Sequence, residues 1–316
     1  MSKERLNIFV MGLDDQNQRE LESIRDAHRF RFHTLLERDE ILLEGEAKPV
    51  AELLERAEQQ LKEFPGSVDG LIAHWDFPVS LLVPVLQKRF GMRGPSLDSL
   101  FRCSHKYLSR LAQHESVPEC TPKFQLLDPF PEDAADNLRI AYPIWIKPVK
   151  SWASQLGFRI ENREQMQEAL KEIREKLPTI AEPYDELLEK IDAPEEVREI
   201  GGDYCLVEEI MSGHEFATEG YVFEGESDVH AIIDMPRHKG SFERYEYPAP
   251  IDPNLAERLR ETTRLLIEEI GFDNGCFNCE FFYNKEQDRI WVIEINPRIS
   301  QSHCYFFHMV DGVSNH

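Results

Sequence analysis

The chain has 316 residues, of which 59 are Asp or Glu and 36 are Lys or Arg, so its formal net charge at pH 7 is -23. Because no basic run offsets this charge, we exclude binding to nucleic acid through phosphate neutralisation and adsorption to an anionic membrane. No segment approaches the roughly 20 apolar residues of a membrane span, and the start lacks the apolar run of a signal peptide, so we expect a cytoplasmic protein.

The first hundred residues predict alternating strands and helices. Residues 6–11 and 70–73 have the composition of buried strands, while residues 47–64 and 78–90 have the apolar spacing of helices. This alternation predicts a small parallel α/β layer. The turn after the first strand lacks the G-x-G-x-x-G pattern, so we infer no dinucleotide cofactor. The six cysteines are scattered, which favours reduced core thiols over a zinc site.

The middle of the chain predicts one long helix and then a strand. Residues 96–122 predict a helix that leads into a proline-punctuated linker, with Lys106 near the start of its regular part. Residues 142–148, YPIWIKP, predict a strand in which Lys147 lies among apolar neighbours. Because a buried ammonium needs an anionic partner, we expect one here, and a phosphate would serve.

An acidic stretch interrupts the regular elements. We expect a helix over residues 163–177 that ends at Pro178, because proline removes a helical hydrogen bond. Residues 179–203 are acidic and contain further prolines and a Gly-Gly pair. We expect them to form a mobile and solvated lid insertion.

Residues 204–215 predict a strand, a bend and a second strand. An adenine ring needs one backbone donor, one backbone acceptor and an apolar wall, which Glu208, Ile210 and Met211 would supply at the bend. Further on, residues 255–270 predict an amphipathic helix closed by Gly271, which we expect to pack behind the hairpin that follows it.

Residues 276–284 and 290–296 alternate in character and flank five polar residues, which predicts an antiparallel hairpin. With those five residues as the loop, Glu280 falls opposite Glu294. Opposed residues have Cβ atoms only about 4.5–5.5 Å apart, where like charges are destabilising. A divalent cation between the two carboxylates would replace this repulsion with an attraction.

The oxygens of Glu280, Glu294 and Asn296 suit Mg²⁺, or Mn²⁺ in its place, because such ions take carboxylate and amide ligands and share their sphere with phosphates. Arg298, positioned by Pro297, would direct its planar guanidinium group to the same metal site. The alternative is an amphipathic hairpin with a solvated acidic face.

Glu280, followed after the hairpin by the run from Glu294 to Arg298 (EINPR), resembles the metal-binding end of the ATP-grasp superfamily. The similarity is to the branch of biotin carboxylase, carbamoyl-phosphate synthetase and the carboxylate–amine ligases, and it covers residues 96–312. It implies an α/β (α+β) ATP-grasp fold, in which a parallel α/β layer precedes two α+β subdomains that hold ATP between them.

The resemblance also implies a division into domains. Residues 1–118 would form the N-terminal α/β domain, residues 119–203 the lid subdomain and residues 204–316 the C-terminal subdomain. Because members of the superfamily continue beyond the position of His316, we expect the last subdomain to be truncated.

The resemblance assigns several nucleotide contacts. Lys106 matches a phosphate-contacting lysine, although His105 stands where the superfamily has an aspartate. Lys147 matches the nucleotide-binding lysine. Ser154 belongs to the segment that covers the phosphates, which is poor in glycine here. Glu215 matches an acid that accepts ribose hydroxyls, and the alternative is an exposed carboxylate at a strand end.

The basic run Arg237-His238-Lys239 is similar to a biotin carboxylase segment, and the resemblance implies that Lys239 acts on a carboxylate, bicarbonate or γ-phosphate. The alternative is a loop that offsets local acids. After Arg298, Ser302 occupies the position of a glutamate that is the superfamily's proposed base for bicarbonate. This difference argues against a simple transfer of that chemistry.

Taken together, the resemblance implies an ATP-dependent ligase that joins a small-molecule carboxylate to an amine through an acyl phosphate, with Mg²⁺. Arg298 and Lys147 would stabilise the acyl phosphate. Two alternatives stay open: a carboxylase that forms carboxyphosphate from bicarbonate, and a catalytically silent ATP-binding module. A homodimer also stays open.

Overall fold

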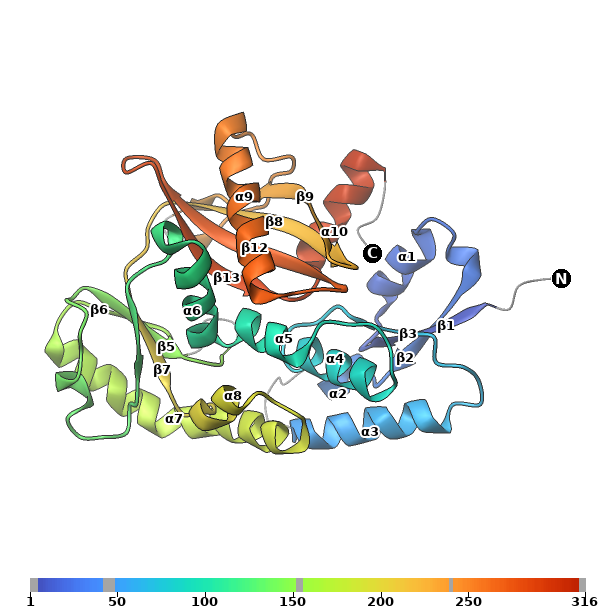
Figure 1. Ribbon diagram of the computed structural model, residues 1–316, viewed down its shortest axis with the longest axis horizontal. Helices are drawn as coiled ribbons and strands as arrows, with labels where there is room; N and C mark the ends of the chain where they lie inside the picture. The colour runs from blue at the N-terminus through green and yellow to red at the C-terminus, as the bar shows by residue number, and fades with distance from the viewer. Residues whose placement is uncertain (1–4, 42–48, 152–155, 239–240, 313–316) are drawn as a thin grey trace.

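The computed structural model describes residues 5–41, 49–151, 156–238 and 241–312 (Figure 1). Within these ranges a parallel sheet of three strands lies at one end of the molecule, and two antiparallel sheets of four strands and one of two strands follow. In the same ranges, no helix combines the length and the apolar character that crossing a bilayer requires. Five of the six cysteines are buried free thiols, as predicted.

The N-terminal layer has the strand order β2-β1-β3, with all strands parallel. Its strands are β1 (Leu6–Met11), β2 (Phe30–Leu35) and β3 (Gly70–Ala73), and its helices are α1 (Asp15–Ser23), α2 (Arg38–Ile41), α3 (Val50–Glu63) and α4 (Val79–Arg89). The predicted strands and helices are confirmed, because buried apolar runs of this spacing can form little else. Strand β2 was not predicted from the sequence.

The single helix expected before the proline-punctuated linker of residues 96–122 is wrong, because two helices stand in its place. The chain forms α5 (Leu97–Ser104) and α6 (Lys106–Ser116), and a 3₁₀ turn follows at Pro118–Cys120. His105 separates the two helices with an extended backbone, and its ring accepts a hydrogen bond from the Leu108 amide at 3.4 Å. As a result Lys106 is the first residue of α6, and its amide donates to the Val149 carbonyl at 2.9 Å.

The second sheet has the order β4-β7-β5-β6, and all its neighbours are antiparallel. Its strands are β4 (Phe124–Leu127), β5 (Ile144–Pro148), β6 (Phe158–Ile160) and β7 (Cys205–Glu209). The first half of α7 (Arg163–Lys190) packs on it, because Met166, Leu170 and Ile173 share one apolar cluster with Ile144 and Val207.

The expected end of the helix at Pro178 is wrong, and so is the solvated character expected of the stretch that follows it. Helix α7 continues through Pro178 and Pro183 to Lys190, and α8 (Glu195–Ile200) follows. Tyr184 packs against Phe77, with ring centroids 6.1 Å apart. Leu187 is fully buried in the large core cluster that also contains the N-terminal layer. Burial of this apolar stripe outweighs the helical hydrogen bonds that the two prolines remove.

The third sheet has the order β13-β12-β8-β9. Its strands are β8 (His214–Phe223), β9 (Glu226–Asp234), β12 (Gly275–Asn284) and β13 (Arg289–Asn296); the short strands β10 (Arg237–His238) and β11 (Ser241–Phe242) pair with each other beside it. Helix α9 (Pro253–Ile270) lies against this sheet, as predicted (Figure 1). The chain then forms α10 (Gln301–Phe306) and a π-helical turn, η4 (Phe307–Asp311).

The hairpin predicted near the C-terminus is confirmed, and Glu280 pairs directly with Glu294. Phe277 and Phe281 on β12 face the core under α9, which leaves Glu280 on the opposite face. The register shifts after Glu280, where Phe281 pairs with Val292, so Ile293 forms a bulge in β13. Bulges of this kind re-aim side chains beside active sites.

Candidate active site

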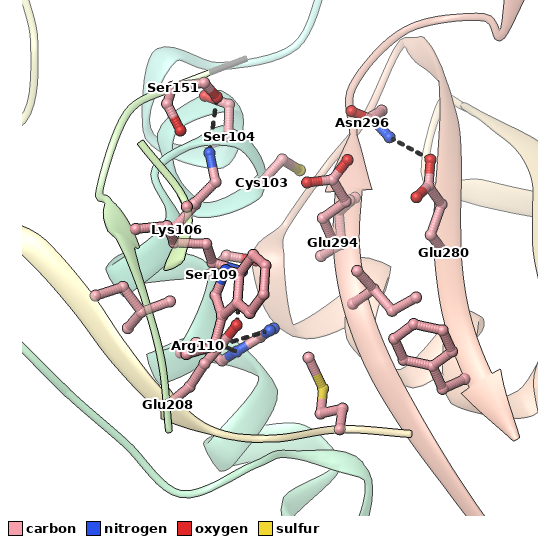
Figure 2. A pocket seen from close by; sticks show the side chains of 18 of the residues that line it. Cys103, Ser104, Lys106, Ser109, Arg110, Ser151, Glu208, Glu280, Glu294 and Asn296 are labelled. Atoms are coloured by element: carbon pink, nitrogen blue, oxygen red, sulfur yellow. Dashed lines mark hydrogen bonds and ion pairs between the residues drawn. The ribbon is translucent and has the colours of Figure 1, made fainter. Parts of the chain in front are cut away.

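A cavity of about 540 Å³ lies between the second sheet and the β12–β13 hairpin (Figure 2). This volume is typical of a site for a small molecule. The sequence-predicted residues that line it come from α6, β5, β7, the β7–β8 linker, β8 and the hairpin: Lys106, Lys147, Glu208, Ile210, Met211, Glu215, Glu280, Glu294 and Asn296. Of the three other predicted residues, Ser154 and Lys239 lie outside the described residues, and Arg298 lines a neighbouring cavity.

One wall of the cavity is basic, and its cations surround a single buried carboxylate. Nζ of Lys147 lies 2.6 Å from Oε1 of Glu208, and Nε of Arg110 donates to Oε2 at 2.9 Å. Burial alone would raise the pKa of Glu208, but Arg110 and Lys147 outweigh it and hold the pKa below its ordinary value. The anionic partner that we expected for Lys147 is therefore present within the protein.

Two further lysines lie where β5 ends. Nζ of Lys106 donates to the Ser151 carbonyl at 2.7 Å. Burial, with a smaller contribution from Lys147, lowers the pKa of Lys106 to about 7, against the opposing effect of Glu294. Burial also lowers the pKa of Lys150, whose ammonium lies 4.9 Å from the centre of the Phe77 ring. Both lysines lie in surroundings that an added anion would stabilise.

The opposite wall is acidic. Burial and the neighbouring charge of Glu294 raise the pKa of Glu280 to about 8. Nδ2 of Asn296 donates to Oδ1 of Asn278 at 3.1 Å and to Oε1 of Glu280 at 3.4 Å. Among the residues that the structure describes, no three His, Cys, Asp or Glu side chains gather as a metal-binding group. The residues available for a cation here are two carboxylates and one amide, a set that suits Mg²⁺ when phosphates complete its sphere.

Glu215 is not the exposed strand-end carboxylate that we considered as an alternative. Its side chain is only 4% exposed, and it forms an ion pair with Arg237, whose Nη2 donates to Oε1 at 3.1 Å. Arg237, expected in a basic loop, therefore has its charge matched at the edge of the cavity. The ribose contact of Glu215 stays a prediction.

A second cavity, of about 490 Å³, adjoins the first and shares Asp76 and Glu280 with it. Arg298 lines this second cavity, and its Nη2 lies 3.1 Å from Oδ2 of Asp76. Burial would raise the pKa of Asp76, but Arg298 and Lys150 outweigh it and lower the pKa. Arg298 thus lies where the two cavities meet.

Sequence reasoning missed Asp76, Arg110 and Lys150 as site residues. Asp76 could have been found, because it follows β3 closely and ligands bind beyond the carboxyl ends of parallel strands. Arg110 lies one helical turn after Lys106 on the same face of α6, which is a weaker signal. Nothing in the local sequence distinguishes Lys150 from a surface lysine.

With this geometry described, the chain can be compared with known proteins. The family model of the ATP-grasp domain matches residues 140–305, which is just over half of the chain. The carbamoyl phosphate synthase large chain of Xylella fastidiosa is 25% identical over 228 residues, which cover 69% of this chain and 19% of that protein. The same protein from Streptomyces avermitilis is 46% identical over 46 residues, 15% of this chain and 4% of that protein. The chain therefore spans about a fifth or less of the length of these curated relatives.

Solved structures share the fold over nearly the whole chain. An L-amino acid ligase from Bacillus licheniformis has a TM-score of 0.73 at 17% identity, covering 97% of this chain and 72% of its own. A biotin carboxylase from Campylobacter jejuni has a TM-score of 0.70 at 16% identity, covering 97% and 68%. An N5-carboxyaminoimidazole synthetase from Staphylococcus aureus has a TM-score of 0.64 at 15% identity, covering 96% and 73%. These likenesses confirm the expected fold.

Proposed function

Because the chain belongs to the ATP-grasp family, we propose that it is an ATP-dependent ligase that joins a small-molecule carboxylate to an amine through an acyl phosphate. One observation carries the proposal: a cavity with one basic and one acidic wall opens beside a second cavity, and Arg298 lies at their junction. The first cavity can hold a nucleotide, and the second can hold the groups that react with it. The L-amino acid ligase among the structures of the same fold supports this choice of reaction.

In this proposal the nucleotide lies along the first cavity. The adenine occupies the linker between β7 and β8, with the backbone around Glu208 and the side chains of Ile210 and Met211. Glu215 accepts a ribose hydroxyl, which requires that Arg237 leave one carboxylate oxygen accessible. Lys106 and Lys147 contact the phosphates, and the lowered pKa of Lys106 supports a position that awaits an anion.

Glu280, Glu294 and Asn296 would hold Mg²⁺, or Mn²⁺. The raised pKa of Glu280 supports this assignment, because two facing carboxylates with no cation between them are unfavourable. When bound, the ion would neutralise charge on the transferred phosphate. The chain's own contribution is to hold the two acids in register on adjacent strands.

The chemistry would occur where the cavities meet. An oxygen of the substrate carboxylate attacks the γ-phosphorus of ATP, the bond to the β-phosphate oxygen breaks, and ADP leaves with that electron pair. The planar guanidinium of Arg298 and the ammonium of Lys147 stabilise the resulting acyl phosphate. An amine then forms the C–N bond and inorganic phosphate leaves.

The roles of Ser154 and Lys239 and the domain boundaries at residues 118 and 203 rest on the family resemblance alone. The cytoplasmic location rests on the composition of the chain, and a homodimer stays open. The described structure adds one observation to the domain question: the second half of α7 packs with the large core rather than with the β4–β7 sheet.

A carboxylase that forms carboxyphosphate from bicarbonate is the second candidate, and the biotin carboxylase of the same fold favours it. The test measures ADP and phosphate release from ATP and Mg²⁺ with mixtures of amino acids, and separately with bicarbonate. A ligase should release ADP only when an organic carboxylate is present and should form an amide. Dependence on bicarbonate would identify the carboxylase, and tight ATP binding without turnover would identify a silent module.

A further inference from the structure

Ser302 stands where the superfamily has a glutamate that is proposed to act as a base. The next residue, His303, is a buried histidine that contacts a buried glutamate. Nδ1 of His303 lies 2.6 Å from Oε1 of Glu219, and the two side chains are only 3% and 2% exposed. Nε2 of His303 is buried and has no hydrogen-bond partner among the residues that the structure describes. Since a buried polar atom without a partner is costly, this nitrogen calls for an explanation.

The hydrogen bonds around Glu219 determine the proton positions of the histidine. A carboxylate can only accept, so the hydrogen bond with Glu219 places a proton on Nδ1 of His303. Oε1 of Glu219 also accepts from Nδ2 of Asn278 at 2.9 Å. In the neutral imidazole Nε2 is then an acceptor with a free lone pair. This is the arrangement in which a carboxylate orients an imidazole to take up a proton.

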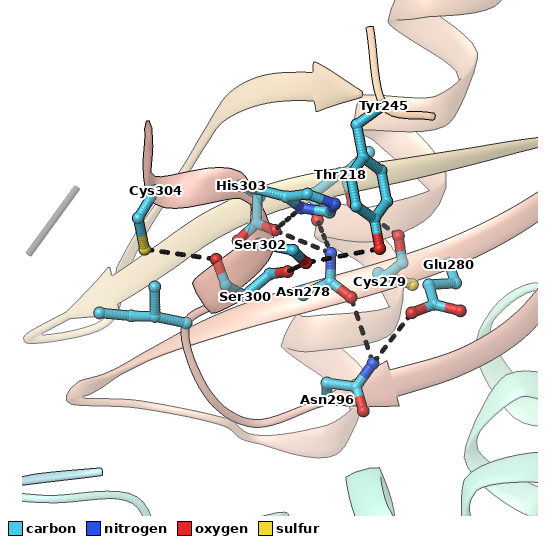
Figure 3. Close-up of polar contacts among 12 residues, drawn as sticks. Thr218, Tyr245, Asn278, Cys279, Glu280, Asn296, Ser300, Ser302, His303 and Cys304 are labelled. Atoms are coloured by element: carbon cyan, nitrogen blue, oxygen red, sulfur yellow. Dashed lines mark hydrogen bonds and ion pairs between the residues drawn. The ribbon is translucent and has the colours of Figure 1, made fainter. Parts of the chain in front are cut away.

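The pair is also connected to the proposed metal ligands. Asn278 accepts from Asn296 at 3.1 Å, and Asn296 in turn donates to Glu280 at 3.4 Å, so side-chain hydrogen bonds run from His303 to the acidic wall (Figure 3). His303, Asn278, Glu280 and Arg298 all line the second cavity. The histidine therefore borders the space that adjoins the proposed site of the acyl phosphate.

We infer that His303, oriented by Glu219, is the general base that accepts the proton of the attacking amine in the second cavity. This inference rests on the proposed ligase function and adds the identity of the base.

The lone pair of the neutral amine forms the C–N bond with the acyl carbon, and the bond from that carbon to the phosphate oxygen breaks, with its electron pair leaving on phosphate. The proton that the nitrogen loses moves to Nε2 of His303. Glu219 then faces an imidazolium and stabilises its charge.

The test separates formation of the acyl phosphate from its capture by an ordinary amine. Hydroxylamine is largely unprotonated at neutral pH, so it can trap an acyl phosphate as a hydroxamate without help from a base. Wild type, His303→Gln and Glu219→Gln are given ATP, Mg²⁺ and a mixture of amino acids, with or without hydroxylamine. His230→Gln, a change at an exposed histidine on β9, is the matched control.

We expect His303→Gln to lower amide formation by about 10²–10³-fold, the usual contribution of a general base, with hydroxamate formation within about threefold of wild type. Glu219→Gln should lower amide formation at least about tenfold in the same selective way, because its amide can bind the wrong tautomer. The His230 variant should behave as wild type.

Retained hydroxamate formation also shows that a variant is folded and binds ATP. If His303→Gln forms amide at the wild-type rate, the inference is overturned. If amide and hydroxamate fall together, His303 acts only on the structure and the inference is again overturned. If wild-type protein releases no ADP with any carboxylate, the proposed ligase function fails, and this inference fails with it.

Discussion

The two walls of the first cavity each contain a glutamate, Glu208 fully buried and Glu280 half-buried, and the pKa values of these two groups move in opposite directions. Arg110 and Lys147 overcome the effect of burial at Glu208 and hold its pKa below the ordinary range. At Glu280, burial and the facing Glu294 act together and raise the pKa to about 8. The two residues are of one type, so the difference comes from the charges that the fold places beside them.

The two glutamates therefore differ in whether the protein itself compensates the charge of the carboxylate. The protein supplies both cations for Glu208, so the charge of this carboxylate is compensated without a ligand. The acidic wall pairs two carboxylates across adjacent strands, with the cost that like charges carry there. This acidic wall is suited to a ligand that binds together with a divalent cation.

The largest effect should come from removing a charge on the acidic wall. Glu294→Gln keeps the size of the side chain but removes one proposed ligand, so ADP formation should fall by about 10²–10³-fold. ATP should also raise the melting temperature of this variant equally with Mg²⁺ and with a chelator, whereas wild type should need Mg²⁺. Glu286→Gln, at an exposed residue of the hairpin loop, is the control. An unchanged Mg²⁺ dependence in Glu294→Gln would remove Glu294 from the metal site.

The second prediction removes one of the two cations beside Glu208 on the basic wall. Lys147→Met leaves Glu208 with Arg110 as its only close cation, and we expect the free energy of unfolding to fall by about 2–3 kcal/mol. Glu208→Gln in addition should lower the stability further, because Arg110, whose side chain is only 2% exposed, then loses its carboxylate partner. Denaturant unfolding of both single variants and the double variant measures the coupling. Strictly additive effects would show that the pair does not stabilise this wall.

The smallest effect concerns the pH dependence of the unliganded protein. The folded state holds a proton on Glu280 up to about pH 8, whereas the unfolded chain loses it near the ordinary pKa of 4.5. Stability from this group is therefore present at low pH and is lost as pH rises between those values. We expect wild type to lose about 1–2 kcal/mol more than Glu280→Gln between pH 5 and pH 8. Parallel stability profiles would contradict the raised pKa.

Local patterns were enough to predict the acidic wall. The pairing of Glu280 with Glu294 follows from alternation along two strands and from the length of the loop between them, and the structure has this register. Strands β1 and β3 of the N-terminal layer were predictable for a similar reason, since each is a short apolar run between polar segments, whereas the more polar β2 was not.

The basic wall depends on contacts that no local pattern contains. Arg110 and Glu208 are separated by 98 positions, and Arg298 and Asp76 by 222. The break at His105 was also missed, because the apolar spacing of α5 and α6 continues across it. The end predicted at Pro178 was wrong because the local rule considers only the hydrogen bond that proline removes. It does not include the burial of Tyr184 and Leu187 by a distant part of the chain.

The continuity of α7 limits how the molecule can move. This helix has 28 residues, or about 42 Å at 1.5 Å per residue, and its two halves belong to different apolar cores. The β4–β7 sheet cannot rotate against the rest of the protein as a free flap, because α7 acts as a strut that ties it to the large core. Any such rotation must be absorbed by bending of α7 and by the segments where the chain enters and leaves this sheet, residues 210–213 among them. The natural place for that bend is the stretch from Pro178 to Pro183, where two amide donors are missing and the strut is weakest.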